Sequence, residues 1–430
     1  MAGLETTYNN LEKFFDHNFW ELKIEGEKLE KGSFTDRLYN WVVACFSSNH
    51  FEHIQRVVST SCKNVKEFKP KTNEEKILLK KAKILRIKYL GYDKKKTWDY
   101  ETRKNSDSTL LQPYKDGKFF YNNEKYKKSY WRVFWLNIKN LFPGTFKNPY
   151  LEDLDSFVEK QKPFYKSKDF KIQWIGHASF LIQVENQNIL IDPVWSNFVS
   201  PCFKRYTKPG IDLDNLPKID TILITHNHVD HLDPKTLQYF LKYQPTVLVP
   251  LKLTSMIKDL GFKNVQELNW FDEVVSTKKE KEVKFTCTPA YHWSQPTNKL
   301  KGNETLWCGW IISANDQNLY HAGDTAFSKK VFDNIKRKFH EICYALLPAA
   351  PEHEEDTHMG VESFFRAVDY LKPEDTIAMH HGAYRTGPER VEDPKNDLQQ
   401  RLTEKPNPHV HVMKIGQIFD SHRETLRAVG

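Results

Sequence analysis

The stretch that decides the fold is Thr225-His226-Asn227-His228-Val229-Asp230-His231-Leu232-Asp233. A largely apolar run over residues 219–224 comes directly before it and predicts a short buried strand. Residues 234–240 come directly after it, and Pro234 is typical of the first position of a helix. The stretch is therefore a polar loop between a strand and a helix, and it carries four side chains of the kinds that bind metals in proteins.

Those four side chains have the spacing of a site for more than one metal ion. His226 and His228 are two residues apart, so both can point the same way from an extended segment. Asp230 and His231 continue around the turn that leads to the helix. Imidazole and carboxylate groups without thiolate favour zinc, with manganese or iron as weaker alternatives. The loop therefore predicts ligands for two ions, and a histidine-rich turn without a metal is the alternative.

Two ions need more ligands than one loop provides. Two four- or five-coordinate ions bind about six or seven protein groups together with water. Later strands, predicted over residues 283–287, 318–321 and 376–379, lead towards three further candidates, which are His292, Asp324 and His380. Because each candidate follows the end of a strand, we predict one site built from all seven side chains.

Strands and helices alternate from residue 171 onwards. Three short strands, over residues 171–175, 180–184 and 188–191, form a predicted meander before the histidine-rich stretch. Helices are predicted over residues 360–371 and 390–402. This order predicts two packed sheets with helices on both outer faces, a four-layer α/β arrangement. The Gly-rich motifs of Rossmann and P-loop nucleotide sites do not occur.

The sequence predicts three segments: an N-terminal extension over residues 1–105, a wrapping segment over 106–170, and the domain with the metal ligands over 171–430. The extension is predicted to be largely helical, and its residues 63–105 hold fifteen Lys and Arg against six Asp and Glu. A capping-box pattern from Thr72 to Glu75 begins a basic amphipathic helix that ends before Gly91. This helix either lies on an anionic membrane surface or packs in the ordinary way with its lysines in water.

Composition indicates a folded protein in a reducing compartment. Of the 430 residues, 39% are hydrophobic, which is enough for a sizeable core. The chain has no run of 18 apolar residues, and its first residues lack the basic and apolar regions of a signal peptide. The six cysteines are widely spread without a Cys-x-x-Cys pair. We therefore expect reduced thiols and a cytoplasmic protein, with peripheral contact at a membrane surface as an addition.

Several motifs together carry a resemblance to a known family. They are Trp174-Ile175-Gly176-His177-Ala178, Ile191-Asp192-Pro193, the motif His226-x-His228-x-Asp230-His231, and His321-Ala322-Gly323-Asp324-Thr325. With these motifs the chain resembles the metallo-β-lactamase fold superfamily of binuclear metallohydrolases. From about residue 110 to about residue 415 it looks more narrowly like the N-acylphosphatidylethanolamine-hydrolysing phospholipase D family. The resemblance implies an αβ/βα metallo-β-lactamase sandwich and makes residues 171–430 a hydrolase domain.

The resemblance also implies how the ligands divide between two zinc ions. One ion would be held by three histidines, His226, His228 and His292. The other would be held by Asp230, His231 and His380, and Asp324 would bridge the two. An additional active-site histidine of the family corresponds to His358, in a segment over residues 348–360 that is shorter and more acidic than its counterpart.

The expected chemistry follows from two adjacent cations. They lower the pKa of a shared water, which gives a metal-bridging hydroxide that attacks a phosphodiester. Asp230 is expected to hold that oxygen in position, and His358 or His381 to protonate the leaving alkoxide. Asp192 and His177 are expected to orient ligand imidazoles. A turn-stabilising aspartate and an ordinary packed histidine are the alternatives for these two.

The resulting function is a phospholipase D-type phosphodiesterase that converts N-acylphosphatidylethanolamine-like lipids into phosphatidic acid and N-acylethanolamine. The partners implied are a phospholipid substrate and a membrane surface. Relatives in this family can dimerise around a lipid-accepting cavity, so the resemblance admits a homodimer. A nucleic-acid partner is not expected, because the Lys-rich segment lacks a stacking pattern. Two alternatives stay open: a metal-dependent hydrolase of a lactone or a nucleic-acid phosphodiester, and a non-catalytic membrane- or partner-binding protein with a structural metal site.

Overall fold

The computed structural model describes residues 114–115, 117–119, 154–200, 203–296, 302–352, 356–387 and 389–420. Apart from Pro296, these residues belong to one compact unit formed by Asp99–Gln295 and Gly302–Gly430. The predicted N-terminal extension with its basic helix, and most of the wrapping segment, lie outside the described residues. The division into three segments therefore stays a prediction. Within the described part of the chain, no helix has the length and apolar character needed to span a membrane.

The first of two seven-stranded sheets contains the predicted meander. Its strands β3 (Lys171–Gly176), β4 (Ser179–Val184) and β5 (Gln187–Ile191) pair antiparallel in sequence order. On the far side of β5 lie three parallel strands, β8 (Thr221–Leu223), β9 (Thr246–Pro250) and β10 (Val265–Leu268). The short strand β18 (Ile418–Asp420) pairs antiparallel with β3 and completes the sheet. Every residue of β3, β4 and β5 is buried, which is expected for strands covered on both faces.

The second sheet has the same mixture of antiparallel and parallel pairing. Four strands pair antiparallel in order, namely β11 (Glu273–Lys278), β12 (Lys281–Thr288), β13 (Gly309–Ala314) and β14 (Gln317–His321). Three more follow β14 in parallel, namely β15 (Tyr344–Pro348), β16 (Asp375–Met379) and β17 (Val410–His411). Because β14, β15 and β16 are parallel, the carboxyl ends of β14 and β16 lie at the same edge of the sheet.

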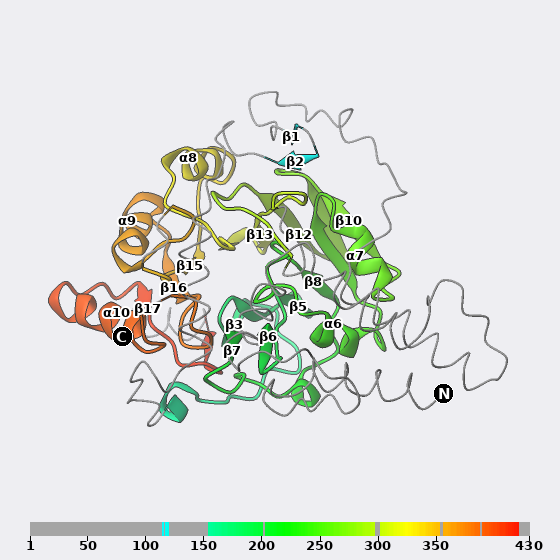
Figure 1. Cartoon of the computed structure of the whole chain (residues 1–430). Coiled ribbons are helices and arrows are strands. Elements are labelled where there is room, and N and C mark those ends of the chain that lie inside the picture. The colour runs from blue at the N-terminus through cyan, green and yellow to red at the C-terminus, as the bar shows by residue number, and fades with distance from the viewer. Residues whose placement is uncertain are drawn as a thin grey trace, which may run out of the picture. The chain divides into compact units, whose positions relative to one another are not determined.

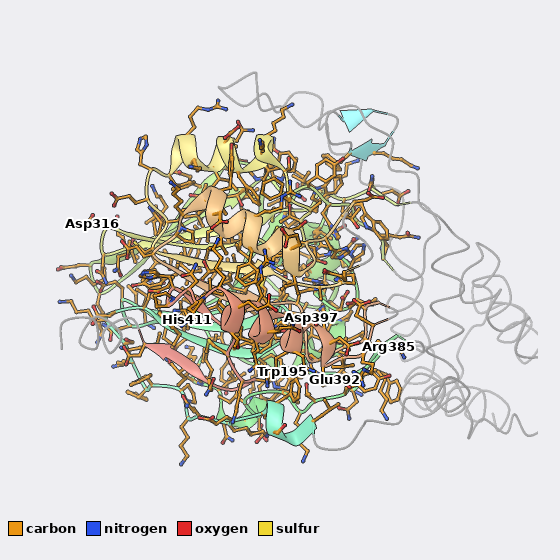
Figure 2. The ribbon with its side chains drawn as sticks, turned by 90° about the vertical axis from the view of Figure 1, so that its left-hand side faces the viewer. Trp195, Asp316, Arg385, Glu392, Asp397 and His411 are labelled. Carbon is orange, nitrogen blue, oxygen red and sulfur yellow. The ribbon has the colours of Figure 1, made fainter. Side chains whose placement is uncertain are left out.

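Helices cover the outer face of each sheet. On the first sheet lie α6 (Pro234–Phe240) and α7 (Thr254–Asp259), and on the second lie α8 (Lys329–Lys338), α9 (Val361–Leu371) and α10 (Asp393–Glu404). Figure 1 shows the two sets on opposite sides of the paired sheets. Figure 2 shows α8, α9 and α10 side by side. The bounds of α6, α9 and α10 agree with the predicted helices to within three residues, whereas α8 was not predicted.

The core between the sheets explains the layers. Along β4, Phe180 and Ile182 pack into a cluster shared with the second sheet, while Leu181 joins the apolar cluster under α6 and α7. Along β15, Leu346 faces the first sheet and Leu347 faces the outer helices. This alternation is the period of two that a strand imposes, and it makes each sheet apolar on both faces. The predicted four-layer α/β fold is confirmed.

Short elements complete the described structure. They are β1 (Tyr114–Lys115), β2 (Lys118–Phe119), the 3₁₀ turns η3 (Leu154–Phe157) and η4 (Leu213–Asn215), and the hairpin β6 (Phe198–Ser200) and β7 (Phe203–Lys204). Helix α6 begins as the sequence predicts, with Pro234 in its first turn and the Asp233 carboxylate accepting from the backbone N–H of Lys235 at 3.1 Å. The cap fixes where the histidine-rich stretch ends.

Truncating a side chain between the sheets should destabilise the protein. Leu346→Ala removes a fully buried side chain and should lower the free energy of unfolding by about 2–5 kcal/mol, because a cavity is left between two rigid layers. Val275, whose side chain is 49% exposed on β11, supplies the control, and Val275→Ala should change stability by less than about 0.5 kcal/mol. Denaturant unfolding checks both, and equal effects in the two variants would contradict the proposed core.

Candidate metal centre

The predicted ligands follow strands of both sheets and lie close together. From the first sheet, β8 leads into the histidine-rich stretch. From the second sheet, β12, β14 and β16 lead to His292, Asp324 and His380 respectively. Seven side chains that are up to 154 residues apart in sequence thus lie together beyond the ends of strands from both sheets. The structure brings together all seven side chains predicted from the sequence.

Four of the seven form a first group, His226, His228, His292 and Asp324. The Nδ1 atom of His228 lies 2.8 Å from Nε2 of His226 and 3.2 Å from Nε2 of His292. The Oδ2 atom of Asp324 lies 3.7 Å from Nε2 of His226 and 3.6 Å from Nε2 of His292. Three imidazole nitrogens and one carboxylate oxygen therefore converge within the span of a single ion's coordination sphere.

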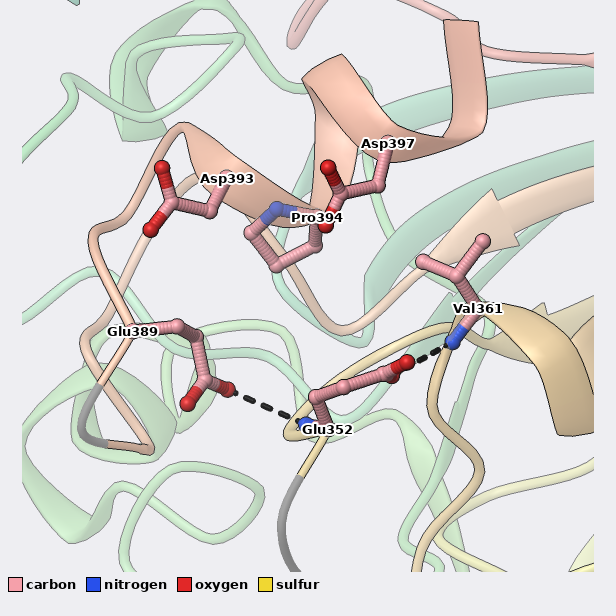
Figure 3. Close-up of a pocket in the computed structure, with 6 residues that line it drawn as sticks. All are labelled: Glu352, Val361, Glu389, Asp393, Pro394 and Asp397. Carbon is pink, nitrogen blue, oxygen red and sulfur yellow. Dashed lines mark hydrogen bonds between the residues drawn. The ribbon is translucent and has the colours of Figure 1, made fainter. Parts of the chain in front are cut away.

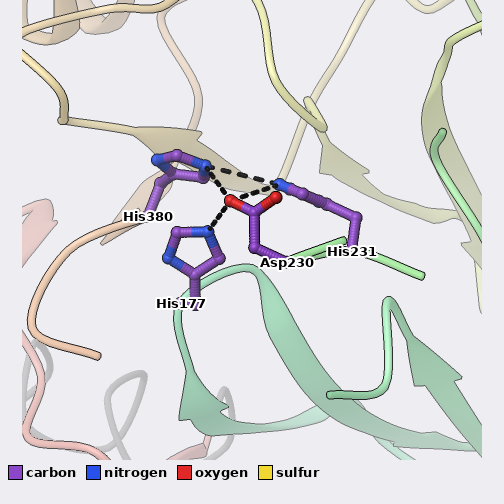
Figure 4. Close-up of side chains that lie close together, drawn as sticks. All are labelled: His177, Asp230, His231 and His380. Atoms are coloured by element: carbon purple, nitrogen blue, oxygen red, sulfur yellow. Dashed lines mark hydrogen bonds and ion pairs between the residues drawn. The ribbon is translucent and has the colours of Figure 1, made fainter. Parts of the chain in front are cut away.

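A second group contains His177, Asp230, His231 and His380 (Figure 4). The Nε2 atoms of His231 and His380 lie 3.3 Å apart, and Oδ2 of Asp230 lies 3.9 Å from each of them. Asp324 reaches this group too, with Oδ2 at 3.2 Å from Nε2 of His231 and Oδ1 at 3.1 Å from Nε2 of His380. The carboxylate of Asp324 is thus shared by both groups, which is where a bridging ligand would lie.

The outward-facing nitrogens of three of the histidines are held by oxygen atoms. The Nδ1 atoms of His292 and His380 lie 2.8 Å and 3.0 Å from the carbonyl oxygens of Thr357 and Ala350, so each Nδ1 carries the hydrogen and donates it. The Nδ1 atom of His231 lies 2.8 Å from the Asp192 carboxylate. In each ring Nε2 is then the nitrogen that faces the centre, and in a neutral ring it carries a lone pair. This donor set fits divalent metal ions such as zinc.

Charges inside the centre balance one another. Burial alone would lower the pKa of His231, but the carboxylates of Asp324 and Asp230 outweigh it and raise that pKa well above its usual range. Burial would raise the pKa of Asp324, yet the neighbouring His231 and His380 hold it well below its usual range. Burial lowers the pKa values of His226 and His292. The carboxylates of Asp230 and Asp324 are therefore ionised and the rings of His226 and His292 are neutral, as metal ligands must be, whereas His231 would have to lose a proton to bind an ion.

Asp192 and Thr225 connect the two groups of ligands. Asp192 follows β5 and accepts three hydrogen bonds: from the backbone N–H of Thr225 at 2.7 Å, from its hydroxyl at 2.6 Å, and from His231 at 2.8 Å. The Thr225 hydroxyl in turn lies 2.9 Å from Nδ1 of His226. The geometry agrees with the expectation that Asp192 orients a ligand imidazole. Thr225 was not singled out from the sequence, although its place directly before His226 is a usable signal.

Of the two predicted proton donors, His358 lies beside the centre and His381 does not join it. The Nε2 atom of His358 is 3.2 Å from Oδ2 of Asp324, and its ring lies 4.8 Å from that of His292. The ring of His381 packs instead on Trp174, with centroids 4.9 Å apart, and burial lowers its pKa to about 3. Asp230 and His358 keep 13% and 9% of their side-chain surface exposed.

An acidic pocket of about 310 Å³ lies between α9 and α10 (Figure 3). Its lining is Glu352, Val361, Glu389, Asp393, Pro394 and Asp397. The Glu352 carboxylate accepts from the backbone N–H of Val361 at 2.7 Å, and Glu389 accepts from the backbone N–H of Glu352 at 3.1 Å. No predicted ligand lines this pocket, and four carboxylates would repel a phosphate. The pocket is therefore not the place where an anionic substrate would meet the metal centre.

Removing the shared carboxylate charge should reduce metal binding. Asp324→Asn keeps the shape of the side chain but removes the negative charge that faces five imidazoles, so the number of ions retained per chain should fall. Asp316→Asn, in the exposed turn between β13 and β14, is the matched control. Elemental quantification on both purified proteins makes the comparison. Equal metal content in the Asp324→Asn and wild-type proteins would contradict the assignment.

Comparison with known proteins adds to this geometry. Residues 187–381 match the family described as Beta-lactamase superfamily domain. The mitochondrial N-acyl-phosphatidylethanolamine-hydrolyzing phospholipase D of Saccharomyces cerevisiae is 33% identical over 239 residues, which cover 53% of this chain and 50% of that protein. The N-acyl-phosphatidylethanolamine-hydrolyzing phospholipase D 1 of Caenorhabditis elegans is 26% identical over 326 residues, or 69% of this chain and 90% of that protein. The chain thus spans about half the length of the S. cerevisiae relative.

A further relative is matched over nearly its whole length. This metal-dependent hydrolase of Caldivirga maquilingensis is 30% identical over 252 residues, which cover 58% of this chain and 97% of that protein. The family match over residues 187–381 contains all seven predicted ligands. The two packed sheets and the converging imidazole and carboxylate groups agree with both findings. The chain belongs to the metal-dependent hydrolases of the beta-lactamase superfamily.

Proposed function

We propose that this hydrolase is a binuclear zinc enzyme of the phospholipase D type. One ion would be held by His226, His228 and His292, and the other by Asp230, His231 and His380. The single observation that carries the proposal is the carboxylate of Asp324, which lies within 3.7 Å of imidazole nitrogens in both groups. When bound, two such ions supply Lewis acidity and an activated water for hydrolysis of a phosphodiester.

The residues around the ions have separate tasks in this proposal. Asp230, whose side chain keeps 13% of its surface exposed, orients the attacking water. His358 stands beside Asp324 and protonates the leaving alkoxide. Because a proton donor must reach the reacting atoms, the buried packing of His381 against Trp174 favours His358 for this task. His381 then has a packing role.

The proposed substrates are N-acylphosphatidylethanolamine-like lipids, cleaved to phosphatidic acid and N-acylethanolamine. Support comes from the S. cerevisiae and C. elegans relatives, whose names state this activity. A lipid substrate implies peripheral contact between a cytoplasmic protein and a membrane, and the family resemblance admits a homodimer. The partial exposure of the Asp230 side chain, at 13%, favours catalysis over a closed structural metal site.

Turnover of lipid vesicles tests the substrate and the proton donor together. The zinc-loaded protein should release N-acylethanolamine and phosphatidic acid from vesicles that contain N-acylphosphatidylethanolamine, and a chelator should abolish the release. His358→Gln should lower kcat by about 10²–10⁴-fold, the range for loss of a general acid, whereas His381→Gln should retain most of the activity. Mass spectrometry of the products gives both rates.

Other outcomes would decide against parts of the proposal. Zinc-loaded protein that opens lactones or cleaves nucleic acid, yet leaves the phospholipid intact, would contradict the substrate. Loss of activity in His381→Gln with full activity in His358→Gln would reverse the assignment of the proton donor. Protein that retains two ions and hydrolyses none of these substrates would favour a structural metal site.

A further inference from the structure

The loop between β3 and β4 holds His177 in an unusual backbone conformation. Its φ angle is +56°, in the left-handed region that residues other than glycine rarely occupy. The His177 carbonyl oxygen accepts from the indole N–H of Trp174 at 2.9 Å and from the backbone N–H of His380 at 3.1 Å. These two bonds tie the loop both to its own strand and to the residue that supplies a predicted metal ligand. The conformation of His177 is thus fixed by the centre.

The ring of His177 makes one hydrogen bond, and that bond goes to a predicted ligand. Its Nε2 atom lies 2.9 Å from Oδ2 of Asp230, while its Nδ1 atom has no hydrogen-bond partner among the described residues. The side chain is fully buried, and its ring packs against that of His380 in a tilted arrangement, with centroids 3.9 Å apart. The sequence predicted that His177 orients an imidazole, but the group that it bonds is a carboxylate.

A second layer of side chains holds the His177 ring in place. The edge of Tyr384 meets the ring at 5.2 Å between centroids, and the guanidinium of Arg205 lies 4.7 Å from the centroid of Tyr384. Both outer residues are themselves anchored, because the Tyr384 hydroxyl donates to the carbonyl of Ser196 and Nη2 of Arg205 donates to the carbonyl of Val194. The ring cannot turn away from Asp230 without displacing this stack.

From this geometry we propose that His177 is a positioning residue that holds the Asp230 carboxylate in the orientation needed for one of the two ions. The proposal rests on the metal centre of the proposed function, and it does not depend on the substrate. A nitrogen that donates its hydrogen to Asp230 has no lone pair for an ion, so the structure assigns His177 a place behind the ligand instead of among the ligands.

Metal titration of two variants separates these roles. In His177→Ala, Asp230 loses its hydrogen-bond donor, so one ion should bind about 10–100-fold more weakly while the ion held by the first group binds as in the wild type. In His177→Gln, the amide Nε2 can replace the imidazole Nε2–H, so both ions should bind close to the wild-type affinity. Calorimetric titration of metal-free protein with zinc measures the affinities, and the absorption spectrum of the cobalt-loaded protein reports the geometry of the second ion.

A matched control removes a similar histidine–aspartate hydrogen bond outside the centre. His411 Nε2 lies 2.7 Å from Oδ1 of Asp375, and His411→Ala should leave both metal affinities unchanged. Weak binding in both His177 variants would make His177 a ligand, and wild-type binding in His177→Ala would make it dispensable. Either result overturns the proposal, as does wild-type protein that binds fewer than two ions.

Separate measurements control for loss of folding and for failure of the proposed function. Circular dichroism and a thermal melt show whether His177→Ala folds. If it does not fold, His177→Gln decides alone, since loss of the second ion or an altered cobalt spectrum in a folded Gln variant overturns the proposal. Wild-type protein that binds two ions but hydrolyses no phospholipid would refute the proposed function and leave the role of His177 standing.

Discussion

A carboxylate buried among imidazoles is the constraint on which the rest of this structure depends. Asp324 is 2% exposed, and five histidines place a nitrogen within 3.7 Å of its oxygens. An isolated carboxylate in such a place would be strongly destabilising, so positive charge must be present nearby, either as imidazolium or as a metal ion. The surrounding histidines come from both sheets, so the geometry of the centre depends on how the two sheets pack.

Large, fully buried side chains in the core between the sheets determine this packing. Trp174, Phe180, Phe285 and Trp310 lie between the layers and fix how one sheet sits on the other. Because packed interiors deform little, the strand ends that carry the ligands inherit a fixed spacing. Trp174 serves both purposes, since its ring packs in this core while its indole N–H holds the His177 carbonyl.

Much of the centre could be predicted from the sequence because its signals are local. The histidine-rich stretch carries four predicted ligands within six residues, and each later predicted ligand follows a predicted strand. The neighbours His380 and His381 show where local signals end. They are adjacent in sequence, yet one ring faces the centre and the other packs on Trp174, and only the long-range packing of β16 decides which is which. The bond from His177 to Asp230 spans 53 residues, and the sequence has no signal that would distinguish a carboxylate partner from an imidazole.

Other elements were not predicted from the sequence. Strand β11 lies at the edge of its sheet and none of its residues is fully buried, so it lacks the continuous apolar run that marks the inner strands.

The origin of the ligands in both sheets has a mechanical consequence. His226 and His228 follow a strand of the first sheet, whereas His292 and His380 follow strands of the second. Ions bound between them would link the two sheets, in addition to the apolar contacts of the core. Sliding or opening of the layers would then break coordination bonds, and the resistance of the domain to unfolding would rise with the concentration of free metal. The same seven side chains would then serve both the candidate metal centre and the cohesion of the two sheets.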